Sequence, residues 1–416
     1  MEKPQLKNKA YSPLGRGLLS YLNYTAAEKK QLANYLLGKE QVPVLEPKIS
    51  LGEISRLEGL LNRARNEYKN DGLQTREFAA VKADELKFLR EYLQFLKDSN
   101  QPKFLKRIIS HYGEIDKDLF HFHLNNLLAR ANAHKRNKVI LKELQGLVAR
   151  EVATDSSRHH EYNISLKLFS QVRKVFKNLY KSELSLLRRS LGEIDTDDQY
   201  SAKELRSLLN QLLEFYKLDG KGWKTIISKE TDKVSINRLQ AEVRVSASIF
   251  RFSRPRMVGL LLHEICAHIL AHQNISRARD LTDMPPRAVE EGLGVFLEQL
   301  ILREPHYMRV YRYLAIGLAM GTDGTPRDMR QVFEILWRLR YLTGQSSSVN
   351  YAKDYAIKEV LRVFRGIPPT TSGVVLTKDK VYLEGNHFIW KLAARGELQL
   401  IFNDFLGKGI RNTIKE

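Results

Sequence analysis

The first 200 or so residues form a series of segments in which apolar side chains recur at helical spacing. Residues 51–70, for example, carry Ile54, Leu57, Leu60 and Leu61 on one face of a helix. The same periodicity predicts further helices over residues 25–37, 78–97, 116–149 and 165–191. We therefore expect residues 1–200 to form a helical N-terminal region.

The pattern changes after residue 200. A capping box, Ser201 to Glu204, opens one more helix, which we expect to end near Gly220. Short segments rich in Val, Ile and Thr follow, and their partial alternation predicts a small antiparallel sheet over residues 223–228, 233–237 and 241–247. Helical periodicity then returns at residues 287–302, 308–320, 326–342, 349–364 and 398–406. The predicted fold class is α+β and predominantly α-helical, with a second domain at residues 201–416.

Composition narrows the setting in which the protein works. Hydrophobic residues make up 43% and charged residues 28% of 416 residues, which is typical of a globular protein with a sizeable core. A single cysteine, Cys266, excludes an internal disulfide and is typical of a reducing compartment. The first residues lack the apolar core of a signal peptide, and the longest apolar stretches are too short to cross a bilayer. We expect a cytoplasmic protein without a transmembrane segment.

The chain is strongly basic, with 68 Lys and Arg against 48 Asp and Glu and a formal net charge of +20. Such an excess favours a polyanionic partner, either nucleic acid, an anionic membrane surface or an acidic protein tail. The basic residues are scattered, and segments such as HKRNKVILKELQGLVAR lack interleaved aromatics for stacking on bases. Nucleic acid stays open as a partner, but the pattern favours an acidic protein.

Residues 261–274, LLHEICAHILAHQN, resemble the zinc-binding helix of metalloproteases except in their spacing. In H-E-x-x-H, two histidines four residues apart share one helical face and the glutamate is the general base. Here His268 follows His263 by five residues, which in an α-helix places the two side chains about 140° apart. A one-residue π-bulge would bring both rings to one side, and such bulges concentrate at functional sites.

A third ligand has to come from another segment. The sequence RAVEEGLGVFLEQ offers Glu290 and Glu291 at the start of the next predicted helix. Two histidines and one acid leave a fourth position of zinc for water, whose pKa falls to about 7. Glu264 would then accept the proton of that water during attack on an amide carbonyl.

Other interpretations of this segment stay open on spacing alone. His272 follows His268 by four residues and could replace His263 as a ligand. Cys266 could be a soft metal ligand or a small buried apolar residue. The histidines could also be satisfied core residues without a metal.

Several motifs in order resemble one family. HEICAHILAHQN followed by EEGLG, and later TKDKVYLEG, is similar to the QEGLA-motif family, which includes the microtubule-associated tyrosine carboxypeptidases that remove the C-terminal tyrosine of α-tubulin. The family pattern is HEIGTH, an asparagine six residues later, and a glutamate before Gly-Leu-Ala. Asn274 and Glu291 stand at the corresponding places, and the resemblance covers about residues 200–410.

The resemblance implies a zincin-like catalytic domain at residues 201–416, with Zn²⁺ on His263, His268 and Glu291 and with Glu264 as the catalytic acid/base. It implies at most a supporting role for Glu290, because the family often has glutamine there. The chain departs from the pattern at three places: Cys266 replaces glycine, Ala267 replaces threonine, and Gly294 replaces alanine. The first two remove backbone freedom and a hydroxyl within the bulge, whereas we expect the third to be minor.

The function expected from these residues is a zinc-dependent metallopeptidase, specifically a carboxypeptidase acting on the C-terminus of a protein or peptide. The alternative is a basic helical protein that binds an anionic polymer and has a structural or vestigial metal site. The residue that binds the substrate carboxylate or steadies the oxyanion stays open among Arg254, Arg256, Arg362, Arg365, Lys378, Tyr351, Tyr355 and Tyr382.

Overall fold

The structure is a computed structural model of the chain, and it divides into two compact units. The first unit comprises Met1–Ser156 and Val310–Lys380, and the second comprises Ser157–Arg309 and Val381–Glu416. Each unit is built from two separate stretches of chain, so these units differ from the predicted division at residue 200. The residues that the structure describes are 18–67, 72–98, 101–134, 136–148, 163–191, 197–228, 234–238, 240–248, 250–277 and 284–408.

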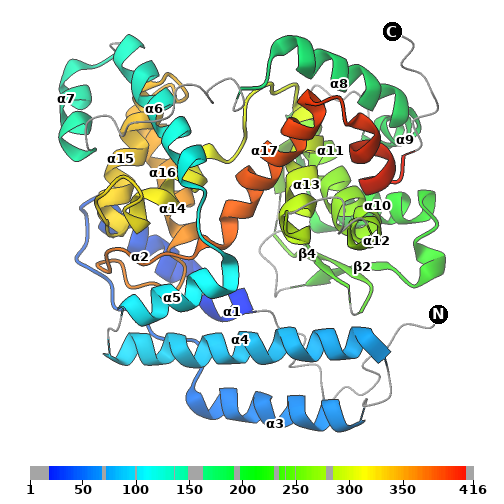
Figure 1. Cartoon of the computed structure of the whole chain (residues 1–416), viewed down its shortest axis with the longest axis horizontal. Coiled ribbons are helices and arrows are strands. Elements are labelled where there is room, and N and C mark those ends of the chain that lie inside the picture. The colour runs from blue at the N-terminus through cyan, green and yellow to red at the C-terminus, as the bar shows by residue number, and fades with distance from the viewer. Residues whose placement is uncertain are drawn as a thin grey trace. The chain divides into compact units, whose positions relative to one another are not determined.

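Among the described residues of the first unit, helices joined by loops are the only regular secondary structure (Figure 1). Its helices are α1 (Leu18–Leu22), α2 (Ala26–Leu36), α3 (Leu51–Glu67), α4 (Gly72–Asp98), α5 (Gln101–Tyr112), α6 (Lys117–His134), α7 (Lys138–Leu147), α14 (Val310–Met320), α15 (Met329–Leu342), α16 (Val349–Val363) and the 3₁₀ turn η6 (Thr377–Lys380). The predicted apolar face of α3 is buried, as expected for an amphipathic helix. The segment predicted as one helix at 116–149 is divided into α6 and α7, because the Asn137 side chain caps a new helix at Lys138.

The second unit contains the remaining helices and all the described strands. Its helical elements are α8 (Leu166–Leu179), α9 (Lys181–Leu191), α10 (Ala202–Phe215), η3 (Asp219–Lys221), α11 (Arg254–Leu262), η4 (His263–Leu270), α12 (Ala271–Arg277), α13 (Pro286–Leu302), α17 (Val381–Ala394) and η7 (Leu400–Phe405). The capping box predicted at Ser201 and Glu204 is confirmed at the start of α10. The predicted helix at 165–191 is two helices, α8 and α9, which meet at Tyr180.

The sheet of the second unit has three short strands, β2 (Lys224–Ser228), β3 (Val234–Asn237) and β4 (Glu242–Ser246), in the order β2-β4-β3. The pairing of β3 with β4 is antiparallel, as predicted. The pairing of β2 with β4 is parallel, with Thr225 opposite Val243, so the sheet is mixed rather than antiparallel. A further antiparallel pair, β1 (Asp197–Tyr200) with β5 (Phe250–Ser253), was not predicted. The strands are too short and too weakly alternating to specify their partners locally.

Helix α17 crosses α13 at two glycines, with backbone against backbone (Figure 1). A Cβ on Gly385 would lie 1.8 Å from the carbonyl oxygen of Ala288, and a Cβ on Gly292 would lie 2.2 Å from the carbonyl carbon of Gly385. No other residue type can occupy such positions without moving one helix away. This contact explains the glycine of the LEG segment and places α17 beside Glu291.

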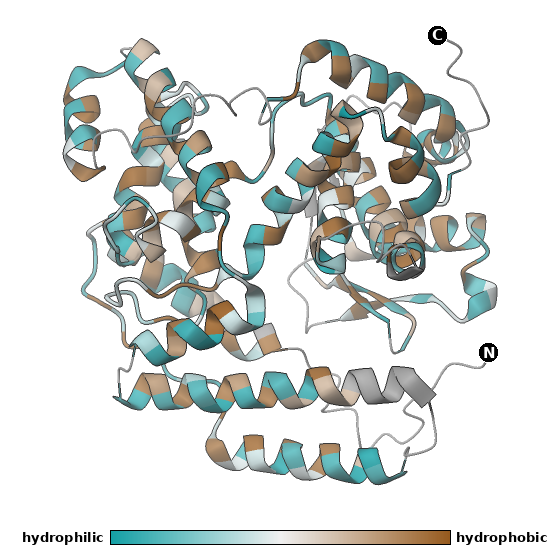
Figure 2. Cartoon of the chain, viewed as in Figure 1, coloured by the Kyte–Doolittle hydropathy of each residue, from teal (hydrophilic) through white to brown (hydrophobic). Residues whose placement is uncertain are grey.

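The core of the second unit is formed around α11, η4 and α13. Figure 2 colours the helices and strands by the hydropathy of their residues. Every residue of α13 from Ala288 to Leu300 is buried, including its three glutamates and Gln299. Such a helix is apolar on all sides apart from a few polar groups, which need partners to be stable in the interior. None of the described helices is long and apolar enough to cross a membrane.

Candidate metal centre

The segment with the two histidines is a π-helix, η4, inserted between α11 and α12. Its wider turn places residues five apart on the same side, whereas an α-helix places them about 140° apart. The Nε2 atoms of His263 and His268 lie 3.2 Å apart as a result. The predicted one-residue bulge is confirmed, and it extends over eight residues.

Glu291 on α13 completes a compact group with the two histidines. Its Oε2 atom lies 3.5 Å from Nε2 of His263 and 3.5 Å from Nε2 of His268. This oxygen is buried, and no hydrogen-bond partner meets it among the described residues. The ligand atoms of these three side chains could hold one metal ion. The structure therefore brings together the three residues that the resemblance named as ligands.

The imidazole of His263 lies along one face of α13. Glu291, Gly294 and Glu298 share this face, because they follow one another by three and four residues. Nε2 of the ring faces Glu291, whereas Nδ1 lies 2.7 Å from Oε1 of Glu298. Gly294 lies directly under the ring, and a Cβ there would be 2.5 Å from its Cε1 and Nε2 atoms.

Glu298 is a residue that the sequence analysis missed. It is buried, and its second carboxylate oxygen accepts a hydrogen bond of 2.8 Å from Arg309. The signal was present in the sequence, since Glu298 follows Glu291 by seven residues, or two helical turns, in a mostly apolar helix. A glutamate at that spacing lies on the same face of α13 as Glu291.

Glu290 lies beside His268, on the side of the candidate centre away from Glu298. Its Oε2 atom lies 3.4 Å from Nδ1 of His268 and accepts a hydrogen bond from Arg238, and its Oε1 atom lies 2.5 Å from Nδ1 of His272. Glu290 thus contacts one of the candidate ligands and does not belong to their group itself. His272 is directed to Glu290 and does not belong to the group of possible ligands, which leaves the alternative pair of His268 with His272 without support.

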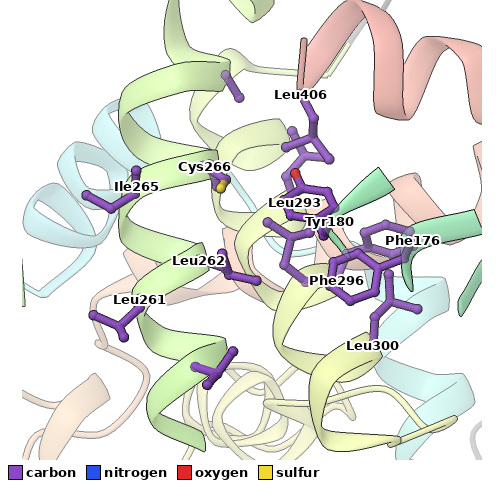
Figure 3. Packing of buried hydrophobic residues seen from close by; sticks show 14 of the residues in the cluster. Phe176, Tyr180, Leu261, Leu262, Ile265, Cys266, Leu293, Phe296, Leu300 and Leu406 are labelled. Carbon is purple, nitrogen blue, oxygen red and sulfur yellow. The ribbon is translucent and has the colours of Figure 1, made fainter. Parts of the chain in front are cut away.

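Cys266 faces away from the group of possible ligands. Its side chain is fully buried on the side of Tyr180 and Leu293, opposite Leu261 and Ile265 (Figure 3). Its Sγ atom is 3.4 Å from the hydroxyl of Tyr216. Burial raises the pKa of the thiol to about 11. Cys266 therefore behaves as a small core residue and not as a soft ligand.

The charges of the centre are strongly coupled. Burial lowers the pKa of His263, but the neighbouring carboxylates of Glu291 and Glu298 outweigh this and raise it to about 10. Burial likewise lowers the pKa of His268, and the neighbouring carboxylates of Glu291 and Glu290 raise it to about 9. Burial raises the pKa of the Glu291 carboxyl, yet the two histidines hold it well below its usual range. The site favours positive charge between these carboxylates.

Glu264 has a different environment from the other glutamates. Burial raises the pKa of its carboxyl, and the nearby His268 and His263 only partly offset this effect. A carboxylate with a raised pKa is a better proton acceptor near neutral pH than an ordinary glutamate. This property fits the role predicted for Glu264.

The other candidates from the sequence lie in defined environments. Asn274, the asparagine of the family pattern, donates a hydrogen bond of 3.2 Å to the carbonyl of Phe405 and so ties α12 to η7. Arg362 and Arg365 belong to the first unit, where both form ion pairs with Asp379. In the second unit, Arg256 lies over the ring of Phe252.

The sequence of the chain matches a known protein family. The sequence profile of the microtubule-associated tyrosine carboxypeptidase family matches residues 97–410. The chain belongs to this family. The match contains every residue of the candidate metal centre and extends well into the first unit, beyond the region of resemblance expected from the motifs. A comparison with curated proteins finds no match.

Membership in the microtubule-associated tyrosine carboxypeptidase family implies that the protein is a peptidase. The π-helix and α13, which carry the buried polar groups of the candidate site, both lie within the matched residues.

Proposed function

We propose that the protein is a zinc-dependent carboxypeptidase whose metal ligands are His263, His268 and Glu291. The separation of the three ligand atoms, 3.2, 3.5 and 3.5 Å, carries this proposal. Tetrahedral zinc with bonds of about 2.0–2.1 Å requires ligand atoms about 3.3 Å apart. The buried Oε2 of Glu291, which has no hydrogen-bond partner among the described residues, fits a metal ligand.

The charge balance of the centre supports a bound cation. The charged groups around the two histidines are the carboxyls of Glu264, Glu290, Glu291 and Glu298 and the guanidinium groups of Arg238, Arg309 and Arg256. When the histidines are neutral and all four carboxyls are ionised, the carboxylates outnumber the guanidinium groups. A cation between the carboxylates offsets this excess, and buried charges are stable only when they are compensated in this way.

The residues of the chain divide the chemistry among them. A zinc ion held by the three ligands would polarise the scissile carbonyl and lower the pKa of a water molecule to about 7. The Glu264 carboxylate takes the proton of the attacking water and transfers it to the leaving amine nitrogen. Cleavage of the C–N bond then releases the C-terminal residue and leaves a new carboxylate on the shortened chain.

The proposed substrate is the C-terminus of a protein or peptide. A C-terminal tyrosine is the first residue to test, because the family is named for a tyrosine carboxypeptidase associated with microtubules. The net charge of +20 favours an acidic tail over a neutral one. The single buried cysteine and the microtubule association of the family support the predicted cytoplasmic location.

Metal analysis combined with peptide cleavage tests the proposal. The purified protein is expected to contain about one zinc per chain and to remove tyrosine from an acidic peptide. Glu264→Gln should retain zinc and lose hydrolysis, because the amide keeps the shape of the carboxylate but cannot accept the proton. Glu291→Ala should lose zinc and hydrolysis together. A Glu264→Gln variant that cleaves peptides at the wild-type rate would exclude Glu264 as the general base.

The alternative function is binding of an anionic polymer by a basic helical protein with a structural or vestigial metal site. The net charge favours it, but a purely structural site has no need of Glu264 beside its ligands. If the protein holds zinc, cleaves no peptide of the library and binds nucleic acid or an acidic polymer, the alternative replaces the proposal.

A further inference from the structure

The two nitrogens of the His263 ring face two carboxylates of one helix. Nε2 faces Glu291, and Nδ1 lies 2.7 Å from Oε1 of Glu298, two turns further along α13. The ring spans the distance between these glutamates because Gly294 leaves space for it on the same face. All of these side chains are buried, so water does not compete for the contacts.

We propose that Glu298, held by Arg309, is a positioning residue that orients His263 and selects the tautomer with which it binds the metal. This inference rests on the proposed zinc site but concerns residues beyond its ligands. The assignment follows from the hydrogen-bond donors and acceptors of the Glu298 carboxylate and the His263 ring. Helix α13 would then provide both the proposed ligand Glu291 and the residue that orients His263.

The tautomer follows from the chemistry of the carboxylate. An ionised carboxylate only accepts hydrogen bonds, so Nδ1 of His263 must carry the proton that it donates to Glu298. In the neutral ring, the lone pair is then on Nε2, which is the nitrogen that faces Glu291 and His268. A carboxylate on the remote nitrogen of a ligating histidine fixes the ring and raises its basicity toward the metal.

Arg309 fixes Glu298 in turn. Its guanidinium donates to Oε2 of Glu298 at 2.8 Å, so the two oxygens of the carboxylate are divided between Arg309 and His263. Arg309 also has a positive φ of 67°, which is uncommon for a residue other than glycine. Such a backbone conformation persists where surrounding contacts support it, and the pair with Glu298 is one contact that Arg309 makes.

The support of His268 provides an internal comparison. Glu290 lies 3.4 Å from Nδ1 of His268, and it also interacts with His272 and Arg238. The contact from Glu298 to His263 is shorter by 0.7 Å, which is the difference between 3.4 and 2.7 Å. Loss of Glu298 should therefore affect the metal more than loss of Glu290.

Zinc affinity of the full chain, measured by competition with a chromogenic chelator, tests the assignment. Glu298→Ala should weaken zinc binding by about 10–100-fold, the usual effect of losing an outer-shell partner. Glu298→Gln should be weakened less than about tenfold, since the amide oxygen still accepts the Nδ1 proton. Leu300→Ala is the matched control, because it removes a buried side chain of the same helix without touching His263, and its zinc affinity should equal that of the wild type.

A double variant separates the lost acceptor from the charge of Arg309. If Glu298→Ala weakens zinc binding because no acceptor remains for Nδ1, then Glu298→Ala with Arg309→Ala stays weak. Restored affinity in the double variant would show that repulsion by Arg309 caused the loss and would overturn the proposal. ¹⁵N NMR of the zinc-loaded wild type should also show Nδ1 of His263 protonated, and a protonated Nε2 would overturn it too.

The outcomes distinguish this inference from the proposed function. If the wild type binds zinc tightly and Glu298→Ala binds it equally well, only the positioning role fails. If the wild type itself does not bind zinc, the proposed function fails, and the positioning role fails with it.

Discussion

The imidazole ring of His263 lies against the backbone of Gly294, where a Cβ would come within 2.5 Å of the ring. We expected the replacement of the family's alanine by glycine at this position to be minor. In this backbone, however, a Cβ at residue 294 would require the ring of His263 to shift. Gly294 is part of the surface that positions a proposed ligand.

We predict that Gly294→Ala displaces the His263 ring and weakens zinc binding. Insertion of a methyl group into a well-packed site costs about 1–3 kcal/mol, and a cost of about 1.4 kcal/mol corresponds to a tenfold weaker affinity. Chelator competition measures the effect. Gly59→Ala is the control, since a Cβ there meets no atom within 4 Å. Unchanged zinc affinity in Gly294→Ala would show that the ring has room to move.

We predict that Gly385→Ala separates α13 from α17. The new methyl would meet the carbonyl oxygen of Ala288 at 1.8 Å, and a backbone atom cannot turn aside as a side chain can. The expected loss is about 3 kcal/mol or more, or roughly 6–12 °C in the thermal midpoint of the second unit. Calorimetry measures this against Gly59→Ala. A midpoint equal to that of the wild type contradicts the close crossing.

His268→Ala and His272→Ala should have opposite outcomes. His268 is a proposed ligand, so its loss should weaken zinc binding by more than about 100-fold, beyond the range of an outer-shell partner. His272 contacts Glu290 and not the centre, so its loss should leave zinc bound. Zinc content after dialysis compares the two variants. Loss of zinc in His272→Ala, with retention in His268→Ala, would reverse the ligand assignment.

Asp379 should make the stability of the first unit depend on pH. Burial raises the pKa of its carboxyl, but Arg362, Arg312 and Arg365 outweigh this and hold the pKa far below its usual range. A carboxyl with a lowered folded-state pKa contributes stability above its unfolded pKa of about 3.9, and this contribution is lost as the pH falls below that value.

The Asp379→Asn variant tests this dependence by urea unfolding at several pH values. At pH 7 it should be less stable than the wild type by about 3–5 kcal/mol, since it leaves buried guanidinium charge uncompensated. Below about pH 4 the difference should shrink by about 1.4 kcal/mol per pH unit. Asp354→Asn, an exposed change on α16, should show neither effect. A difference that grows toward acid pH would have the wrong sign for a paired carboxylate.

The net charge of +20 predicts a salt effect on cleavage. If basic side chains recruit an acidic tail, kcat/KM for an acidic peptide should fall steeply with added salt, because exposed charges are screened within about 8–10 Å near physiological ionic strength. A neutral peptide with the same last residues should change little. An equal response of the two peptides would remove the argument for an acidic partner.

Local sequence patterns were sufficient to predict several helices and the π-bulge of this protein. The capping box at Ser201, the apolar face of α3 and the extra residue between His263 and His268 each depend on neighbours in the chain. Their spacing is visible in the sequence, and the five-residue separation of the two histidines predicts a π-bulge. Glu291 was chosen as a ligand by resemblance, whereas spacing alone left Glu290 and Glu291 equal.

The tertiary structure decided which groups meet across elements. Glu298 and Gly294 have a role only because α13 lies against the π-helix, and the glycine at 385 is required only because α17 crosses α13. The parallel pairing of β2 with β4 likewise joins strands separated along the chain. The periodicity of a sequence predicts which face of a helix or strand is buried. It does not predict which other element packs on that face, because contacts between distant segments depend on the packing of the whole unit.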